Sequence, residues 1–144
     1  MKLMRILATK TGDVITVHPE QQIREAVRLL SEHNIGALVV VDAAGKPVGI
    51  ISERDIVRRA ADNEGVLAEQ VRDIMTRRVI IGMPQDDLYS VINTMTEKRF
   101  RHLPIMDEGR LIGIISIGDV LKAQRDAYQG EIDTLETQIM ADEA

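Results

Sequence analysis

The chain has 144 residues, which is enough for one ordinary domain or for two small repeats that share a core. Hydrophobic residues make up 44% of the chain and aromatic residues only 2%, so the core must be aliphatic. Few aromatic side chains are present that could stack on the bases of a nucleic acid. The formal net charge of −5 also argues against a nucleic-acid partner, because proteins that bind nucleic acids are usually basic.

The sequence has no cysteine, which excludes disulfide bonds and thiolate chemistry. No apolar run approaches the ~18–20 residues that a membrane span needs. The segment 1–8 is interrupted by Lys2 and Arg5, so it does not have the pattern of a signal peptide. We therefore expect a cytoplasmic protein with no membrane partner.

Apolar periodicity and turn residues predict the elements of the first half. β-branched residues before Pro19 predict a strand, and residues 20–33 carry apolar side chains at the i, i+3, i+4, i+7 spacing of an amphipathic helix. Two continuous apolar runs separated by the turn residues 42–45 predict a pair of strands. The expected order is a helical lead-in, a strand, a helix, two strands and a helix, over residues 1–8, 14–17, 20–33, 37–41, 47–51 and 52–60.

The second half repeats the first. Val14 aligns with Val79, 65 residues further on, and residues 71–76 take the place of the lead-in. The sequence Gly-Ile-Ile-Ser-Glu-Arg-Asp at 49–55 returns as Gly-Ile-Ile-Ser-Ile-Gly-Asp at 113–119. One unit of about 45–50 residues can hardly bury a sheet face alone. We therefore predict an α/β fold of two β-α-β-β-α units packed about a pseudo-two-fold axis.

Residues 119–144 are expected to form one long C-terminal helix. Gly130 weakens this helix by up to about 1 kcal/mol. Pairing with a helix of a second chain is one interpretation of its pattern, and packing on its own module with a frayed end is the other. The seam that suits a partner helix consists of apolar residues seven apart: Leu121, Tyr128 and Leu135, with Ile132 and Ile139.

The repeated Ser-x-x-Asp motif, Ser52 to Asp55 and Ser116 to Asp119, has two interpretations. At a helix start it is a capping box, worth about 1 kcal/mol. The capping box favours Glu or Gln at its last position, however, and both copies carry the shorter Asp. A helix start with free amides and a hydroxyl also suits a phosphate, and a carboxylate beside it can accept both hydroxyls of a ribose. The motif therefore predicts a nucleoside-phosphate site as well as a helix cap.

Three features together give the chain a family resemblance. The segment Asp-Ile-Met-Thr at 73–76 precedes a predicted strand, Leu-Pro-Ile-Met-Asp at 103–107 forms another, and the two Gly-Ile-Ile-Ser-x-x-Asp motifs follow in the same order. The chain resembles a stand-alone, bacterial-type signal-transduction module made of a tandem pair of CBS domains, named from cystathionine β-synthase. The resemblance covers almost the whole chain. It implies two CBS repeats and a C-terminal helical tail, at residues 1–66, 67–124 and 125–144.

The resemblance implies a regulatory protein rather than an enzyme. Members of the family typically bind adenosine compounds in clefts between the repeats and use occupancy to regulate a partner. For this chain it implies AMP first, or else ATP, NAD(H) or S-adenosylmethionine, as a regulatory ligand that reports energy or redox state. It also implies a homodimer and a separate, unknown target protein. The alternative is a structural or protein-interaction module with degenerate clefts, since fold alone does not settle function.

The residues by themselves also favour a protein that is not an enzyme and holds no metal. No P-loop and no Ser-His-Asp set can be nominated from the sequence. The three histidines, His18, His33 and His102, do not lie at metal-ligand spacing.

The resemblance further implies that each site pairs the motif of one repeat with the lead-in threonine and the first two strands of the other. In each site the aspartate would take the ribose hydroxyls, and the serine and threonine would lie near ribose or phosphate. The apolar strands would enclose the adenine. The first site would use Ser52, Arg54, Asp55, Thr76, Ile81, Phe100, Arg101 and His102. The second would use Ser116 and Asp119 with Thr11, Thr16, Ile35, Gly36 and Ala37.

The two sites are not expected to be equivalent. Arg54 of the first motif is replaced by Gly118 in the second, and the segment 98–102 is rich in cations. Arg101 and His102 of that segment are open to two interpretations, phosphate contact or a solvated loop. The asymmetry suggests AMP at one site and a larger ligand such as NADH at the other. The remaining cations of the segment are expected to be solvated: Lys98 and Arg99.

Overall fold

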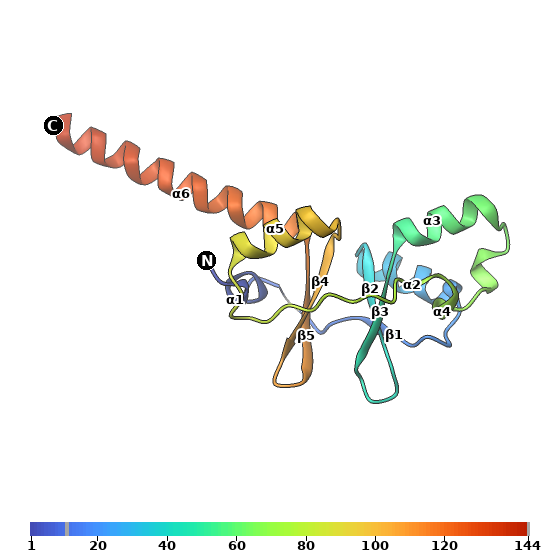
Figure 1. Ribbon diagram of the computed structural model, residues 1–144. Helices are drawn as coiled ribbons and strands as arrows, with labels where there is room; N and C mark the ends of the chain where they lie inside the picture. Colours follow the sequence, from blue (N-terminus) through green and yellow to red (C-terminus); the bar gives the residue numbers. More distant parts are fainter. Residues whose placement is uncertain (11, 144) are drawn as a thin grey trace.

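The computed structural model describes residues 1–10 and 12–143, and it shows two α/β units with a long helix projecting from one of them (Figure 1). The two units are related by a pseudo-two-fold axis, as predicted, and follow the same order except that the second unit, in the residues described, lacks the first strand. The first unit consists of β1 (Thr16–Val17), α2 (Ile23–His33), β2 (Ala37–Val41), β3 (Pro47–Ser52) and α3 (Glu53–Asp62). The second consists of α5 (Leu88–Lys98), β4 (His102–Asp107), β5 (Arg110–Ser116) and α6 (Ile117–Glu143).

The first unit has a three-stranded sheet in the order β1-β2-β3. β1 pairs in parallel with β2, where Val17 faces Val40, and β2 pairs antiparallel with β3, where Leu38 faces Ile51. All five residues of β2 are buried, as its continuous apolar sequence predicts for a central strand. β3 alternates buried and half-buried residues, so Ile51 enters the core whereas Ile50 faces the other side.

The second unit has a two-stranded sheet among its described residues, in place of the three strands predicted. The strand expected at residues 79–80 does not form, and pairing is reduced to a single parallel bridge between Gly82 and Ile105. A Cβ at Gly82 would lie 2.6 Å from the Leu103 side chain, so a larger residue could not approach β4 here. The corresponding strand of the first unit is also shorter than predicted and covers only Thr16–Val17.

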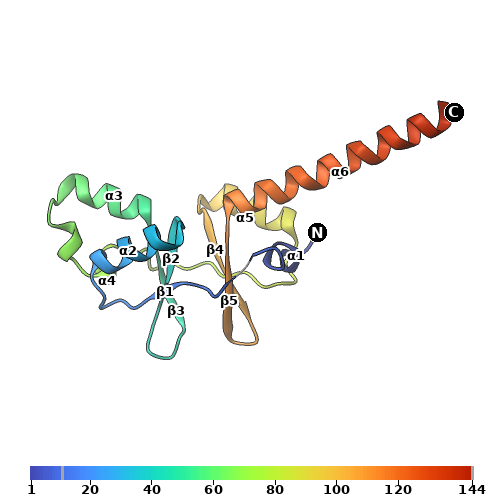
Figure 2. The same ribbon diagram turned by 180° about the vertical axis from the view of Figure 1, so that it is seen from behind.

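The two lead-in helices are exchanged between the units. α4 (Val71–Ile74) buries Val71 in the core of the first unit, whereas α1 (Leu3–Leu7) buries Leu3 in the core of the second. The Val71 and Leu3 amides donate equivalent backbone hydrogen bonds, at 2.8 and 3.0 Å, to the loop before the first helix of the unit on which each packs. The chain therefore crosses between the units in both directions (Figure 2).

The linker between α3 and α4, residues 63–70, is also packed. It contains the 3-10 turn η1 (Val66–Ala68), which buries Val66 in the core of the first unit. Val66 of this linker and Val71 of α4 lie in the same core, on either side of the boundary predicted at residues 66/67. The predicted division of the chain at residues 66/67 and 124/125 stays a prediction.

α6 runs as a single helix over residues 117–143 and projects away from the two units (Figures 1 and 2). The last residue of the predicted helix, Ala144, lies outside the described residues. None of the helices within residues 1–10 and 12–143 is both long and apolar enough to span a membrane. Pairing of α6 with a second chain stays a prediction. The side chains of the predicted seam are between 48% and 58% exposed: Leu121, Tyr128, Ile132, Leu135 and Ile139.

We expect Gly49→Val to destabilise the first unit. A Cβ at Gly49 would lie 2.7 Å from the Met75 sulfur and 3.0 Å from the Thr76 carbonyl oxygen, in the segment that crosses β3. Overpacking of this kind costs roughly 1–3 kcal/mol, which should lower the melting temperature by roughly 5 °C in a circular dichroism melt. Gly130→Ala is the control, because nothing lies within 4 Å of a Cβ there. Equal melting temperatures for Gly49→Val and the wild type would contradict this close packing.

Candidate nucleotide site

Both Ser-x-x-Asp motifs close a capping box at the start of a helix. In the first, the Asp55 amide donates to Ser52 Oγ at 3.2 Å and the Ser52 amide donates to Asp55 Oδ2 at 2.9 Å. In the second, the corresponding distances between Ser116 and Asp119 are 3.1 and 2.9 Å. Aspartate is shorter than the Glu or Gln that the capping box favours, but its carboxylate reaches the N-cap amide in both copies, so the predicted helix caps are confirmed. Whether each motif can also bind a ligand, in addition to capping its helix, therefore depends on its surroundings.

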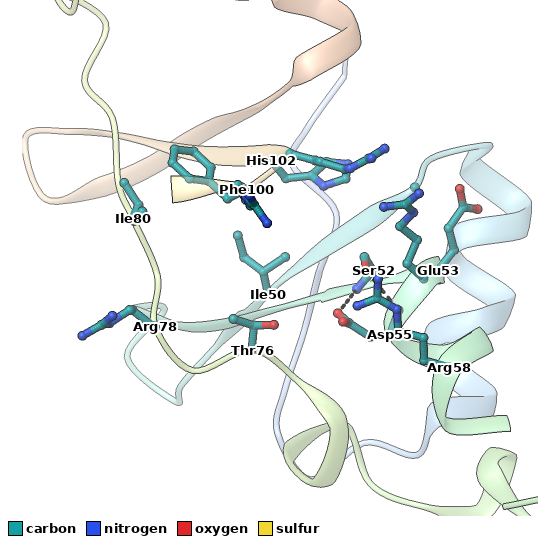
Figure 3. A pocket seen from close by; sticks show the side chains of 14 residues that line it. Ile50, Ser52, Glu53, Asp55, Arg58, Thr76, Arg78, Ile80, Phe100 and His102 are labelled. Atoms are coloured by element: carbon teal, nitrogen blue, oxygen red, sulfur yellow. Dashed lines mark hydrogen bonds between the residues drawn. The ribbon is translucent and has the colours of Figure 1, made fainter. Parts of the chain in front are cut away.

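A cavity of about 390 Å³ opens in front of the first motif, between the two units (Figure 3). One wall comes from β3 and the start of α3, and the opposite wall comes from the connection between α5 and β4. The segment that follows α4 closes the cavity on a third side. The lining residues are Gly36, Ile50, Ser52, Glu53, Arg54, Asp55, Arg58, Thr76, Arg78, Ile80, Arg99, Phe100, Arg101 and His102.

The structure brings together seven of the eight residues predicted for the first site. The exception is Ile81, which is 45% exposed and does not line the cavity. Its neighbour Ile80 takes that place, on the same unit as Phe100 (Figure 3). Residues 79–81 do not form a strand. The alternation of side chains along a strand therefore could not be used to predict whether Ile80 or Ile81 faces the cavity. Contact of the seven with a ligand stays a prediction: Ser52, Arg54, Asp55, Thr76, Phe100, Arg101 and His102.

Several lining residues were missed by the sequence-based prediction. Ile50 could have been found, because β3 alternates and Ile51 faces the core. Arg58 could also have been found, because it lies four residues after Arg54 and hence on the same face of α3. Arg99, expected to be solvated, lines the cavity as well. The remaining missed residues carry no local signal: Glu53, Arg78 and Ile80.

The cavity combines an apolar wall with an excess of positive charge. Two carboxylates, Glu53 and Asp55, face five arginines along its lining. Among residues 1–10 and 12–143, the Asp55 carboxylate has no ion pair, and the Ser52 amide is the donor that it binds. Asp55 therefore keeps acceptor capacity for a ligand. The five arginines are Arg54, Arg58, Arg78, Arg99 and Arg101.

His102 lies where the two units meet, half-buried at the start of β4. A Cβ at Gly36 would be 3.7 Å from His102 Nε2, so the ring lies against the loop before β2. Burial lowers the pKa of His102 below its usual value of 6.5, the charge of Asp119 opposes this shift, and that of Lys10 adds to it. His102 is therefore neutral at pH 7 and can donate a hydrogen bond as well as accept one.

The second motif has different surroundings from the first. Lys10 Nζ donates to Asp119 Oδ2 at 2.6 Å and to the Ile114 carbonyl oxygen at 2.8 Å. Burial raises the pKa of Asp119, but hydrogen bonds from Lys10 and Ser116 outweigh it, and the pKa lies below its usual value of 3.8. The second carboxylate is thus ionised at neutral pH and already has a cation partner.

The residues predicted to complete the second site are not among those that line the cavity beside its motif, and one of them is not described. Thr11 falls outside the described residues. Thr16 lies in β1, Ala37 is buried in β2, Ile35 packs on the core of the first unit, and Gly36 lines the first cavity. A role for these residues in ligand binding stays a prediction. A cavity of about 370 Å³ beside the second motif is lined instead by Met1, Arg5, Ile6, Thr9, Lys10, Asp119, Lys122, Ala123 and Asp126.

Repeat, topology and motif geometry together define a tandem α/β module with a cleft between its units. The family model of the CBS domain matches the chain twice, over residues 6–62 and 71–126. The chain belongs to the CBS domain family, as the resemblance implied.

Individual relatives agree with this assignment. The CBS domain-containing protein YhcV of Bacillus subtilis is 35% identical over 112 residues, which cover 78% of this chain and 79% of that protein. The crystal structure of a CBS-domain-containing protein from Agrobacterium tumefaciens has a TM-score of 0.81 and 42% identity, and covers 86% of this chain and 99% of that one. The CBS domain pair of protein MJ0100, solved in complex with 5′-methylthioadenosine and S-adenosyl-L-methionine, has a TM-score of 0.77 and 29% identity, with coverage of 88% and 98%.

Proposed function

We propose that the chain is a regulatory module that binds an adenosine nucleotide in the cavity in front of Ser52 and Asp55. One observation carries the proposal: a single cavity holds a carboxylate with free acceptor capacity, a helix start, an apolar wall and five arginines. These are the groups that ribose, phosphate and adenine require. The complex of the MJ0100 domain pair with two adenosine compounds supports a ligand of this class.

Each part of a nucleotide has a partner in the cavity. The Asp55 carboxylate accepts the two ribose hydroxyls, whose O–H groups donate. Ile50, Ile80 and Phe100 enclose the base, and their apolar surface favours the transfer of its faces out of water. The surrounding arginines hold the phosphate together with the Arg54 amide, since the Glu53 and Asp55 amides already donate to the Gly36 carbonyl and to Ser52 Oγ.

The size of the cavity favours a mononucleotide. Its volume of about 390 Å³ lies toward the lower end of the roughly 300–1,000 Å³ that is typical of small-molecule sites. AMP is therefore the first candidate, followed by ATP, NAD(H) and S-adenosylmethionine. The proposal includes no catalytic role. It retains the expectations of a homodimer, a cytoplasmic location and a separate target protein to which the energy or redox state is reported.

A thermal-shift screen against AMP, ADP, ATP, NAD, NADH and S-adenosylmethionine tests the proposal. A ligand that binds only the folded state at 100 times its Kd stabilises it by about 2.7 kcal/mol, so a binder should raise the melting temperature by several degrees. Asp55→Asn should reduce that rise by about half or more. A flat response to all six compounds would overturn the proposal and favour the structural module with empty clefts.

We expect the affinity for AMP to increase as the pH falls from about 8 to about 6. The pKa of free His102 lies below 6.5, and a phosphate bound nearby would raise it, so the complex takes up a proton and is favoured at lower pH. The phosphate also titrates near pH 6, so the measurement compares wild type with His102→Gln by calorimetry across this range. Identical pH profiles for the two proteins would show that His102 does not face the phosphate.

A further inference from the structure

Lys10 breaks the symmetry between the two motifs. In the first unit, the Ile50 carbonyl accepts a hydrogen bond from the Thr76 amide at 2.8 Å, and the Ile50 amide donates to the Thr76 carbonyl at 3.0 Å. The equivalent of Ile50 in the second unit is Ile114. Its carbonyl accepts from the Lys10 ammonium at 2.8 Å. The Lys10 ammonium therefore contacts a carbonyl of the second unit whose equivalent in the first unit accepts from a backbone amide.

A difference in chain length accompanies this change. Leu3 and Val71 occupy equivalent positions, because their amides make equivalent bonds to the two units. The chain from Leu3 to Pro19 is three residues longer than the chain from Val71 to Pro84. The longer segment contains Lys10, and its ammonium reaches back over β5 to the second motif.

The Lys10 ammonium binds the Asp119 carboxylate, which is the group that would recognise a ribose. Asp119 Oδ2 accepts from the Ser116 amide at 2.9 Å and from Lys10 Nζ at 2.6 Å, whereas Asp55 Oδ2 accepts from the Ser52 amide. An ammonium has three N–H donors, so it can satisfy a carboxylate as the two hydroxyls of a ribose would. The ion pair is partly shielded, since the lysine and aspartate side chains are 39% and 29% exposed.

We infer that Lys10 is an internal occupant of the second carboxylate site, and that it limits the chain to one bound nucleotide. This inference rests on the proposed function of the Ser52 cavity. The two motifs then differ in kind: Asp55 is available to a nucleotide, and Asp119 is held by the chain itself. The cavity beside Asp119, with Lys122 and Arg5 in its lining, becomes a second nucleotide site when the ammonium is removed.

Calorimetric titration of AMP into Lys10→Met tests the inference, because methionine keeps much of the side-chain length without the charge. The wild type should bind one AMP per chain and Lys10→Met should bind two. Adding Asp119→Asn to Lys10→Met should weaken the new site at least tenfold. Lys122→Met is the matched control, because it removes a cation of the same cavity but leaves the Lys10–Asp119 pair, and it should keep a single site. A carbon-detected NMR titration should show a higher pKa for Asp119 in Lys10→Met.

Two results would overturn the inference. The first is a wild type that already binds two AMP molecules, one of them dependent on Asp119. The second is a Lys10→Met variant that gains no Asp119-dependent site. In that case the Lys10–Asp119 pair would only hold the segment after α1 in place. Failure of the proposed function gives a different result, namely no AMP binding that depends on Asp55 in the wild type. A new Asp119-dependent site in Lys10→Met would then still support Lys10 as the occupant of the second carboxylate, but it would overturn the role of Lys10 in limiting the chain to one nucleotide.

Discussion

Asp55→Asn is expected to weaken AMP binding by one to two orders of magnitude while the protein stays folded. Asparagine keeps a side-chain oxygen for the Ser52 amide, but it loses the charge and part of the acceptor capacity that two ribose hydroxyls require. Loss of such a polar contact in a cleft costs about 1–3 kcal/mol, which corresponds to roughly 5- to 150-fold in Kd. Isothermal titration calorimetry measures the change.

The repeat supplies a matched control for this variant. Asp119→Asn perturbs the same capping box in the second motif and also the Lys10 ion pair, so it should lower the melting temperature at least as much. At pH 8, where His102 is neutral with or without the charge of Asp119, it should leave the affinity of the first site for AMP unchanged. If both variants lost stability and neither lost binding, the motifs would act as helix caps only and the structural-module alternative would gain support.

The double variant Arg54→Ala with Arg101→Ala is expected to weaken AMP binding by about 100-fold or more. The two arginines line the cavity from opposite units, Arg54 from the start of α3 and Arg101 from just before β4. Hydrogen bonds to charged groups contribute about 1.5–3 kcal/mol each, so loss of two phosphate contacts exceeds the effect of any single substitution in the site. The affinity for adenosine, which has no phosphate, should change little.

Calorimetric titration of both AMP and adenosine distinguishes two roles of the arginines: binding the charged phosphate and supporting the walls of the cavity. Arg24→Ala is the control, because Arg24 is exposed on α2 and does not line the cavity. It should bind both compounds as the wild type does. Equal losses for AMP and adenosine in the double variant would mean that the arginines support the walls of the cavity rather than the phosphate.

Local sequence predicted most of the fold because each element buries one apolar face. The five-residue run of β2 is buried throughout, and the expected strand 37–41 matches it residue for residue. The helical spacing over residues 20–33 places Ile23, Ala26 and Leu30 in the core, as an amphipathic helix requires. The strand expected at residues 79–80 does not form. Contact with β4 occurs at Gly82, where the absence of a side chain allows it.

The exchange of α1 and α4 could not be predicted from local sequence. A short amphipathic segment has an apolar face but carries no signal for the core that will receive it. Leu3 enters the core that contains Leu88, in the unit that comes later in the chain. Val71 enters the core that contains Ile23, in the unit that precedes it. This arrangement is decided by the two connections that cross between the units, and these are visible only in the tertiary structure.

The sequence by itself determined the repeat, the aliphatic cores and the two Ser-x-x-Asp motifs at helix starts. These features depend on residues close together in the chain, whose period and spacing are directly visible. The sequence also predicted that the two sites differ, because Arg54 is replaced by Gly118, but only the tertiary structure showed that Lys10 pairs with the second motif. Lys10 and Asp119 are 109 residues apart in sequence, and the Lys10 Nζ lies 2.6 Å from the Asp119 Oδ2. The pair forms because the longer segment after α1 crosses β5, and no local pattern records where a flexible lysine side chain finds its carboxylate.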